Sequence, residues 1–138
     1  MSDFLLDTNV VSELRKGRRA DSNVTSWFAQ IADEEIFLSV VTIGEIRRGV
    51  ESVRRRDPDS AASLDRWLAR LSEAHGERIV PVDRAIAEEW GRINVPDPLP
   101  VIDGLLAATA RALGLTLVTR NVADVEGTGV ELLDPFAR

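Results

Sequence analysis

The 138-residue sequence contains no cysteine. Disulfide bonds, thiolate metal sites and cysteine nucleophiles are therefore excluded. Histidine and lysine occur once each, as His75 and Lys16. Without a convincing histidine partner, none of the serines or threonines predicts a nucleophile triad.

Long apolar runs are also missing, since none approaches the roughly 20 residues that a membrane-spanning helix requires. The N-terminal segment carries Asp3 rather than a basic region. We therefore expect neither secretion nor a membrane anchor, and the cytoplasm is the expected location. No phosphate-binding P-loop occurs, and Gly127-Thr128-Gly129 is too short for a dinucleotide loop.

The formal net charge is -6, which argues against bulk electrostatic attraction to nucleic acid. Its distribution is uneven, because residues 1–56 hold nine basic and nine acidic side chains whereas residues 57–138 hold eight and fourteen. Two arginine-rich runs, at 15–19 and 54–56, are candidate phosphate-contacting patches. Such charge runs are more often simply solvated faces.

Apolar periodicity predicts strands that alternate with helices in a single domain covering residues 1–138. The expected strands are 4–6, 36–40, 79–82, 115–118 and 131–133. The expected helices are 10–16, 24–32, 43–56, 61–75, 86–93 and 102–113. This alternation predicts an α/β fold, with a central, largely parallel sheet of four to five strands and helices on both faces.

Two minor features have ordinary structural interpretations. Trp27, Trp67 and Trp90 lie on apolar helical stripes and predict core or dimer contacts. His75 stands next to Gly76 near a helix end and is expected at the surface.

Four carboxylates occupy comparable positions in this pattern. Asp7 follows the first strand, Glu45 opens the helix after the second, Asp103 opens the helix before the fourth, and Asp124 lies in the loop after it. Ligands of such sheets bind outside the carboxyl ends of the strands. We therefore expect the four side chains at one edge of the sheet.

Each carboxylate also has a purely structural interpretation. Asn9 is a candidate N-cap with Asp7 supporting the turn, and 42–45 matches a capping box. Asp103 is expected near the N-terminus of a helix, where a negative charge interacts favourably with the helix dipole. Asp124 has the polarity of a solvated loop residue. Asp7 and Asp103 nevertheless adjoin strongly apolar segments, where a charge needs a partner.

A divalent cation would be such a partner. Carboxylates without cysteine or a nearby histidine form an all-oxygen site, which suits Mg²⁺ or Mn²⁺ rather than Zn²⁺. A metal-bound water can attack a phosphodiester, and a second ion about 4 Å away can stabilise the leaving oxygen. The constellation therefore indicates metal-assisted phosphodiester hydrolysis.

Three stretches carry a family resemblance: "LLDTNVVSEL", "SVVTIGEIRRGV" and "PVIDGLLAATARALGLTLVTRNVADVEGTGVELLDP". In this order they resemble the PIN-domain nucleases, and more narrowly the VapC and FitB-like toxins of bacterial type II toxin-antitoxin systems. The resemblance implies a three-layer α/β/α fold and a Mg²⁺-dependent endoribonuclease. One departure is Val125, where the family often has an aromatic residue after the fourth acid.

The resemblance also assigns roles to residues and partners. It implies that Asp7, Glu45 and Asp103 bind Mg²⁺ directly or through water and that Asp124 completes the site. The polar residues that would orient these carboxylates or waters are Thr8, Asn9, Thr119 and Asn121. The implied partners are RNA as substrate, a VapB-type antitoxin that blocks the acidic cleft, and a second copy in a homodimer or a larger toxin-antitoxin assembly.

Two other classes of function remain open at this stage. A non-catalytic module could use the same acids to receive a basic partner segment. An aspartyl-phosphate enzyme fits poorly, because the residue two after Asp7 is Asn9 and no lysine occurs late in the chain. DNA also remains a possible substrate.

Overall fold

The computed structural model describes residues 3–137 and contains one sheet of five short strands. The strands are β1 (Phe4–Leu6), β2 (Ile36–Ser39), β3 (Ile79–Val80), β4 (Thr116–Val118) and β5 (Leu132–Leu133). Their order is β3-β2-β1-β4-β5, and every neighbouring pair is parallel. The predicted parallel sheet is confirmed.

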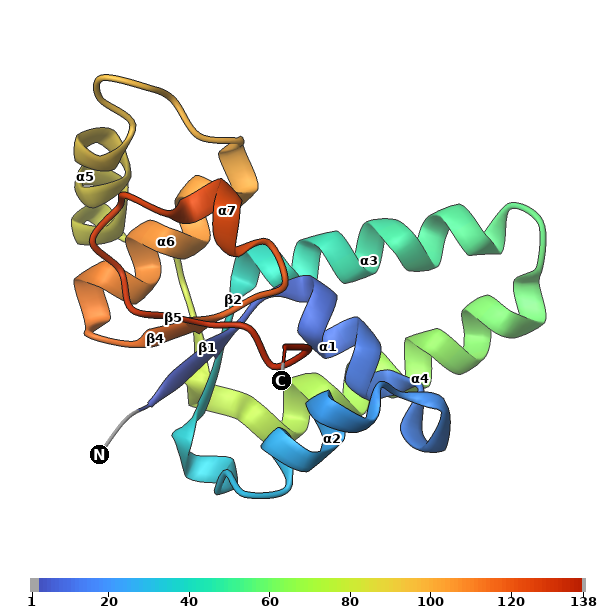
Figure 1. Cartoon of the computed structure of the whole chain (residues 1–138). Coiled ribbons are helices and arrows are strands. Elements are labelled where there is room, and N and C mark those ends of the chain that lie inside the picture. The colour runs from blue at the N-terminus through green and yellow to red at the C-terminus, as the bar shows by residue number, and fades with distance from the viewer. Residues whose placement is uncertain (1–2, 138) are drawn as a thin grey trace.

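Helices connect these strands and cover both faces of the sheet (Figure 1). They are α1 (Thr8–Arg15), α2 (Ser22–Phe28), α3 (Val40–Arg54), α4 (Pro58–His75), α5 (Arg84–Ile93), α6 (Val101–Leu113) and α7 (Val122–Val125). Three short 3-10 turns, η1 (Gly17–Arg19), η2 (Asp33–Glu35) and η3 (Gly76–Arg78), lie between them. No helix in residues 3–137 combines the length and apolarity needed to cross a membrane.

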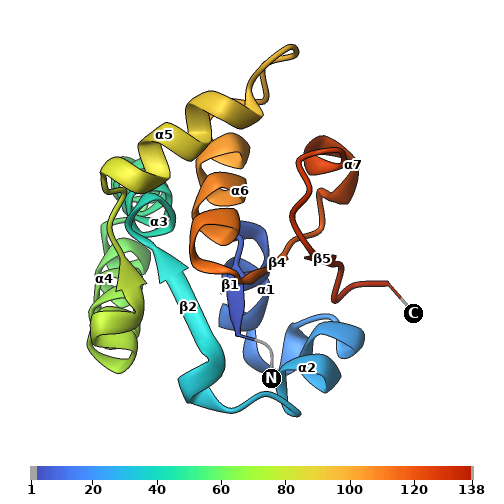
Figure 2. The same ribbon diagram turned by 90° about the vertical axis from the view of Figure 1, so that its left-hand side faces the viewer.

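The two faces of the sheet bury separate apolar clusters because side chains alternate along a strand. Phe4 and Leu6 of β1 face a cluster built with α1 to α4, whereas Leu5 faces one built with α6. Figure 2 shows the sheet between these helical layers. The three-layer α/β/α architecture is therefore confirmed.

Helices α3 and α4 form a hairpin that extends beyond the sheet (Figure 1). Arg54 bonds both Glu51 and Asp65, at 2.9 and 2.8 Å, and Arg47 bonds the same two acids. The network joins the two helices across their exposed edges.

Several helix starts differ from the sequence prediction. Helix α1 begins at Thr8 rather than Val10, and its N-cap is Asp7 rather than Asn9. Helix α3 begins at Val40 with Ser39 as its cap, so the predicted capping box at 42–45 is wrong. In both cases a polar residue at the strand end accepts the first free backbone N–H groups, so the helix starts with no intervening loop.

Two strand ends and one helix are shorter than predicted. The second helix begins at 22, because Asp21 caps it by accepting from the amides of residues 23 and 24, and it ends at 28 rather than 32. The second strand stops at Ser39, and the third covers only 79–80.

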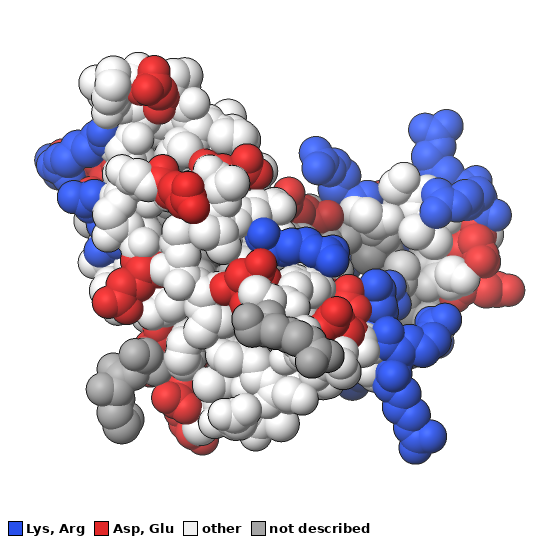
Figure 3. All heavy atoms as spheres, viewed as in Figure 1, with Lys and Arg blue, Asp and Glu red and all other residues white. Residues whose placement is uncertain are grey.

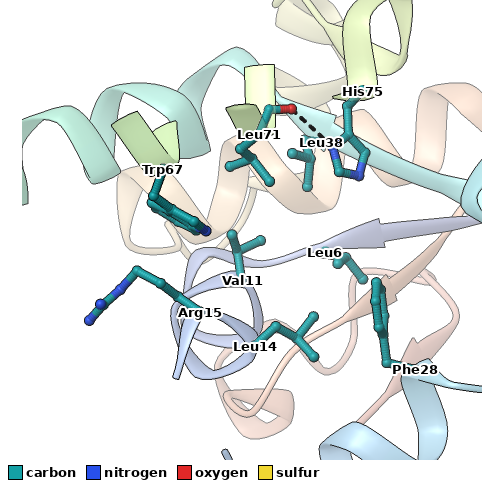
Figure 4. Close-up of a pocket in the computed structure, with 9 residues that line it drawn as sticks. All are labelled: Leu6, Val11, Leu14, Arg15, Phe28, Leu38, Trp67, Leu71 and His75. Carbon is teal, nitrogen blue, oxygen red and sulfur yellow. Dashed lines mark hydrogen bonds between the residues drawn. The ribbon is translucent and has the colours of Figure 1, made fainter. Parts of the chain in front are cut away.

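The tryptophan prediction is confirmed for packing in the core. Trp27 and Trp67 pack against the cluster under α1 to α4, and Trp90 lies against Gly104 of α6. His75 is half-buried rather than at the surface: it lines an apolar cavity with Leu71 and donates from Nδ1 to the Leu71 carbonyl oxygen at 3.1 Å (Figure 4).

Candidate active site

Asp7 lies at the centre of the candidate site, directly after the middle strand. Its backbone N–H donates to the Val118 carbonyl at 2.9 Å and so continues the β1–β4 pairing. Strand β1 has β2 on one side and β4 on the other, which makes its end a topological switch point where ligands of such sheets bind. The side chain is only 6% exposed.

Neutral donors hold both carboxylate oxygens of Asp7. The Thr8 amide donates to Oδ1 at 2.6 Å, and the Thr119 hydroxyl donates to Oδ2 at 2.7 Å. The Asn9 side-chain amide reaches Oδ2 at 3.4 Å. The carboxylate is therefore fixed in orientation by groups that carry no positive charge.

Glu45 is joined to this group through Thr8. The Thr8 hydroxyl donates to Glu45 Oε1 at 2.5 Å and lies 3.3 Å from the hydroxyl of Thr42. Glu45 is the sixth residue of α3 rather than part of its first turn. Its bond to Thr8 therefore places the second turn of α3 against α1. Thr42 is fully buried and was not predicted as a site residue, because its sequence neighbours indicated a helix cap.

Asp103 and Asp124 belong to α6 and α7, the helices that precede and follow β4, which lies on the opposite side of β1 from β2. Asp103 is the third residue of α6. The N-cap residue of this helix is Pro100, whose side chain forms no capping hydrogen bond. Asp124 lies within the single-turn helix α7, so its predicted position in a loop is wrong. Asp103 is half-buried and Asp124 is exposed.

The electrostatics connect all four acids. Burial raises the pKa of Asp103, and the charges of Asp7, Asp124 and Glu45 raise it further. Burial also raises the pKa of Asp7; hydrogen bonds from Thr119 and Thr8 lower it, and the charge of Glu45 raises it. The charges of the other three acids therefore act on Asp103, and the charge of Glu45 acts on Asp7. A shared metal-binding edge for all four carboxylates stays a prediction.

No side-chain cation offsets this charge among residues 3–137. None of the four acids has a basic nitrogen within 4.0 Å, whereas surface acids such as Glu51 and Asp65 do. As placed, no three Asp, Glu or His side chains in that range form a group that could hold an ion. Mg²⁺ usually binds one or two carboxylates and keeps several waters, so the all-oxygen donor set suits it.

The four predicted orienting residues differ in how they contact the candidate acids. Thr8, Asn9 and Thr119 each bond a candidate acid through a side chain. Asn121 is linked through its backbone: its N–H donates to the Thr119 hydroxyl at 3.0 Å, and its carbonyl accepts from the Asp124 amide at 3.1 Å. Asn9 also accepts from the Arg120 amide at 3.3 Å, which ties α1 to the segment after β4.

Comparison with known proteins gives a consistent result across the chain. The family model described as PIN domain matches residues 4–123. A VapC ribonuclease of Sinorhizobium fredii is 29% identical over 96% of this chain and 97% of its own length. The toxin FitB of Neisseria gonorrhoeae is 27% identical, covering 96% and 98%. The crystal structure of FitAcB from Neisseria gonorrhoeae superposes with a TM-score of 0.90 at 27% identity, covering 98% of this chain and 99% of that one.

Proposed function

Because the chain belongs to the PIN-domain family, we propose that it is a Mg²⁺-dependent endoribonuclease that acts as the toxin of a type II toxin-antitoxin system. Similarity over nearly the whole length to proteins named toxin and ribonuclease supports this proposal. It assigns hydrolysis of RNA phosphodiester bonds to the edge of the sheet where Asp7 lies.

One observation carries the proposal: a buried carboxylate at the switch point of a parallel sheet has only uncharged donors and other carboxylates around it. A charge in such a place needs compensation. Elsewhere in the described chain, carboxylates such as Asp65 are neutralised by arginine, but Asp7 is not. A bound cation would offset the charge of Asp7 and of the acids that raise the pKa of Asp103.

In this proposal Asp7, Glu45, Asp103 and Asp124 hold Mg²⁺, with Mn²⁺ as a substitute. When bound, the ion would supply a Lewis acid that activates water and stabilises negative charge on phosphate oxygens. Thr119 and the Thr8 amide keep the Asp7 carboxylate in one orientation, and the Thr8 hydroxyl does the same for Glu45. Such orienting contacts preserve site geometry when the ligand changes.

The proposal also assigns partners to the chain. The structure of FitAB bound to a DNA fragment superposes with a TM-score of 0.88 at 26% identity. By this similarity we expect an antitoxin of VapB type that covers the acidic edge, and a homodimer within the resulting assembly. The cytoplasm is the location where such a toxin meets RNA.

The test is cleavage of total bacterial RNA by purified, antitoxin-free protein with Mg²⁺ or EDTA. The Asp7→Asn and Asp103→Asn variants keep side-chain volume and remove one negative charge each. Discrete fragments that require the metal and both carboxylates would support the proposal. Equal metal-dependent cleavage by either variant would show that the site is wrongly assigned.

A second candidate is a non-catalytic PIN-like module that receives a basic partner segment at the same acids. The absence of a side-chain cation near the four carboxylates in the described chain also suits this role. Tight binding of a partner, together with no calorimetric Mg²⁺ binding and no cleavage of any RNA, would favour it.

A further inference from the structure

We propose that the exposed arginines of the α1–η1 end and the α3–α4 hairpin bind the phosphate backbone of the RNA and hold it beside the acidic edge. This inference rests on the proposed function and adds the surface that carries the substrate. It is needed because four carboxylates at one site, in a chain of net charge -6, repel a polyanion.

Basic residues that lack an acidic partner concentrate on one part of the molecule. We call this part the arginine face. At the α1–η1 end it comprises Arg15, Arg18 and Arg19; on the hairpin it comprises Arg48, Arg55, Arg56, Arg66 and Arg70. Within residues 3–137 none of these has a carboxylate oxygen within 4.0 Å. Figure 3 shows Lys and Arg atoms gathered on the side where Figure 1 places α3, α4 and the end of α1.

The hairpin remains positive after its own ion pairs form. Between residues 47 and 70 there are seven arginines and four acidic residues. Two of the acids, Glu51 and Asp65, bond Arg47 and Arg54, and Asp57 caps α4 by accepting from Ser60. The remaining guanidinium groups are therefore available to a ligand, on a hairpin that the ion-pair network stiffens.

Two arginines of the face, Arg15 and Arg48, line hollows that also contain Glu45. One groove contains Glu45 and Thr8 at one end and Arg15 and Trp67 further along. A second hollow, on the other side of α3, contains Glu45, Arg48 and Ile102. The Arg15 guanidinium lies 5.9 Å from the Trp67 ring centre, which connects α1 to α4. A strand bound by the arginines would therefore pass the carboxylates.

Residue type favours a phosphate ligand. Of the seventeen Lys and Arg residues, sixteen are arginine, whose planar fork matches phosphate oxygens through two hydrogen bonds. The side chains of the face stand on solvent-exposed helix edges, and Trp67, the aromatic side chain beneath Arg15, is half-buried. Stable protein interfaces depend instead on buried aromatic or apolar anchors. A nucleic-acid backbone therefore fits the face better than a folded protein does.

The experiment measures binding of a fluorescein-labelled single-stranded RNA oligonucleotide by anisotropy at several salt concentrations. The Asp7→Asn background prevents cleavage during the measurement. Two test variants, Arg18→Gln/Arg19→Gln and Arg55→Gln/Arg56→Gln, each remove two positive charges from the face. The matched control is Arg84→Gln/Arg92→Gln on α5, which removes the same charge from exposed positions elsewhere.

Each test variant is expected to bind RNA at least ~10-fold more weakly at low salt, with the salt slope reduced by about 1.4 for two lost phosphate contacts. At 0.1 M salt, where the Debye length is about 10 Å, the control should bind within about twofold of the parent, because general charge effects at longer distances are screened. Unfolding midpoints equal to that of the parent would exclude loss of fold. Equal RNA affinity of test and control variants would overturn the inference.

The outcomes also separate this inference from the proposed function. Cleavage is compared with the same arginine substitutions in the chain that retains Asp7. If those face variants cleave RNA as the control does, and the Asp7→Asn face variants bind RNA as their control does, the nuclease stands and the face is not its substrate surface. If wild type cuts nothing while the face variants still lose RNA binding, the surface stands and the nuclease proposal fails. Loss of antitoxin binding with unchanged RNA binding would identify the face as a protein interface and overturn the inference.

Discussion

The hydroxyl of Thr119 donates to Asp7 Oδ2 at 2.7 Å, joining two side chains 112 positions apart in the chain. Both follow the carboxyl ends of adjacent parallel strands, β1 and β4. The same hydroxyl accepts from the Asn121 amide at 3.0 Å, so it fixes the segment that leads to α7 as well. This contact links the central acid of the site to the segment that carries Asp124.

Replacing Thr119 with valine should move the acidic limb of the cleavage pH profile to higher pH. The hydrogen bond lowers the pKa of Asp7, so its loss leaves that carboxyl harder to ionise. Stability should fall by about 1 kcal/mol because a buried hydrogen bond is lost. The measurements are a pH–rate profile and urea unfolding.

Thr109→Val is the matched control for that change. Thr109 is also buried, but its hydroxyl donates to the Leu105 carbonyl within α6 at 2.7 Å. It should alter stability without moving the pH profile. Identical profiles for the Thr119 and Thr109 variants would contradict the orienting role of Thr119.

Asp7→Asn should make the metal-free protein more stable at neutral pH while it abolishes cleavage. Burial raises the pKa of Asp7 above the ordinary value of 3.8, so the folded chain holds a proton that the unfolded chain has released. Wild-type stability is therefore lost as pH rises from about 3.8 through the raised pKa, and asparagine avoids this loss.

Unfolding of both proteins in EDTA between acidic and neutral pH measures this difference. The stability advantage of the asparagine variant should grow with pH and then level off. Added Mg²⁺ should stabilise wild type more than the variant, because ligand binding to the folded state raises its stability. A pH-independent difference would contradict the raised pKa.

Arg111→Gln should increase the Mg²⁺ concentration needed for half-maximal cleavage several-fold. Arg111 Nε bonds Glu89 of α5 at 2.8 Å, and its Nη1 donates to the Thr128 carbonyl. Thr128 in turn closes α7 through its hydroxyl, which donates to the Val125 carbonyl at 2.8 Å. Losing the guanidinium should loosen the loop behind Asp124 and lower stability by about 1 kcal/mol.

Arg92→Gln provides the comparison, since the Arg92 side chain also pairs with Glu89 but is 65% exposed and, within residues 3–137, bonds Glu88 and Glu89 rather than the loop. Exposed ion pairs of this kind contribute little. The Mg²⁺ dependence of cleavage and thermal unfolding should therefore stay close to wild type. Equal Mg²⁺ requirements for the Arg111 and Arg92 variants would exclude a link to Asp124.

Gly104→Ala and Gly91→Ala should change stability in opposite directions. A Cβ on Gly104 would lie 3.2 Å from Trp90 Nε1 and 3.3 Å from its Cδ1, so the Trp90 side chain would have to move by a few tenths of an ångström. Overpacking of this kind costs about 1–3 kcal/mol. Gly91 has nothing within 4 Å, and alanine there should stabilise α5 by about 0.5–1 kcal/mol.

Chemical denaturation of the two alanine variants tests this contrast directly. The Gly104 variant should also cleave more slowly, because Gly104 follows Asp103 and shares its turn of α6. A stabilised Gly104 variant would mean that Trp90 adjusts without cost.

The sequence by itself predicted the order of the five strands and of the described helices other than α7, and it singled out the four candidate acids. Apolar periodicity is a local property, so 4–6, 86–93 and 102–113 were predicted to within about two residues at each end. Asp7 and Asp103 stood out because a charge next to an apolar segment is costly wherever the chain folds.

Only the tertiary structure decided which acid each orienting group bonds and which helix ends the acids occupy. Asp7 caps α1 because β1 delivers it directly to the helix start, whereas sequence preference alone pointed to Asn9. The bonds from Thr119 to Asp7 and from Thr8 to Glu45 cross 112 and 37 positions, and Thr42 became part of the site only when α3 packed beside α1. Contacts between distant segments depend on how the elements pack, and local preference carries no information about them.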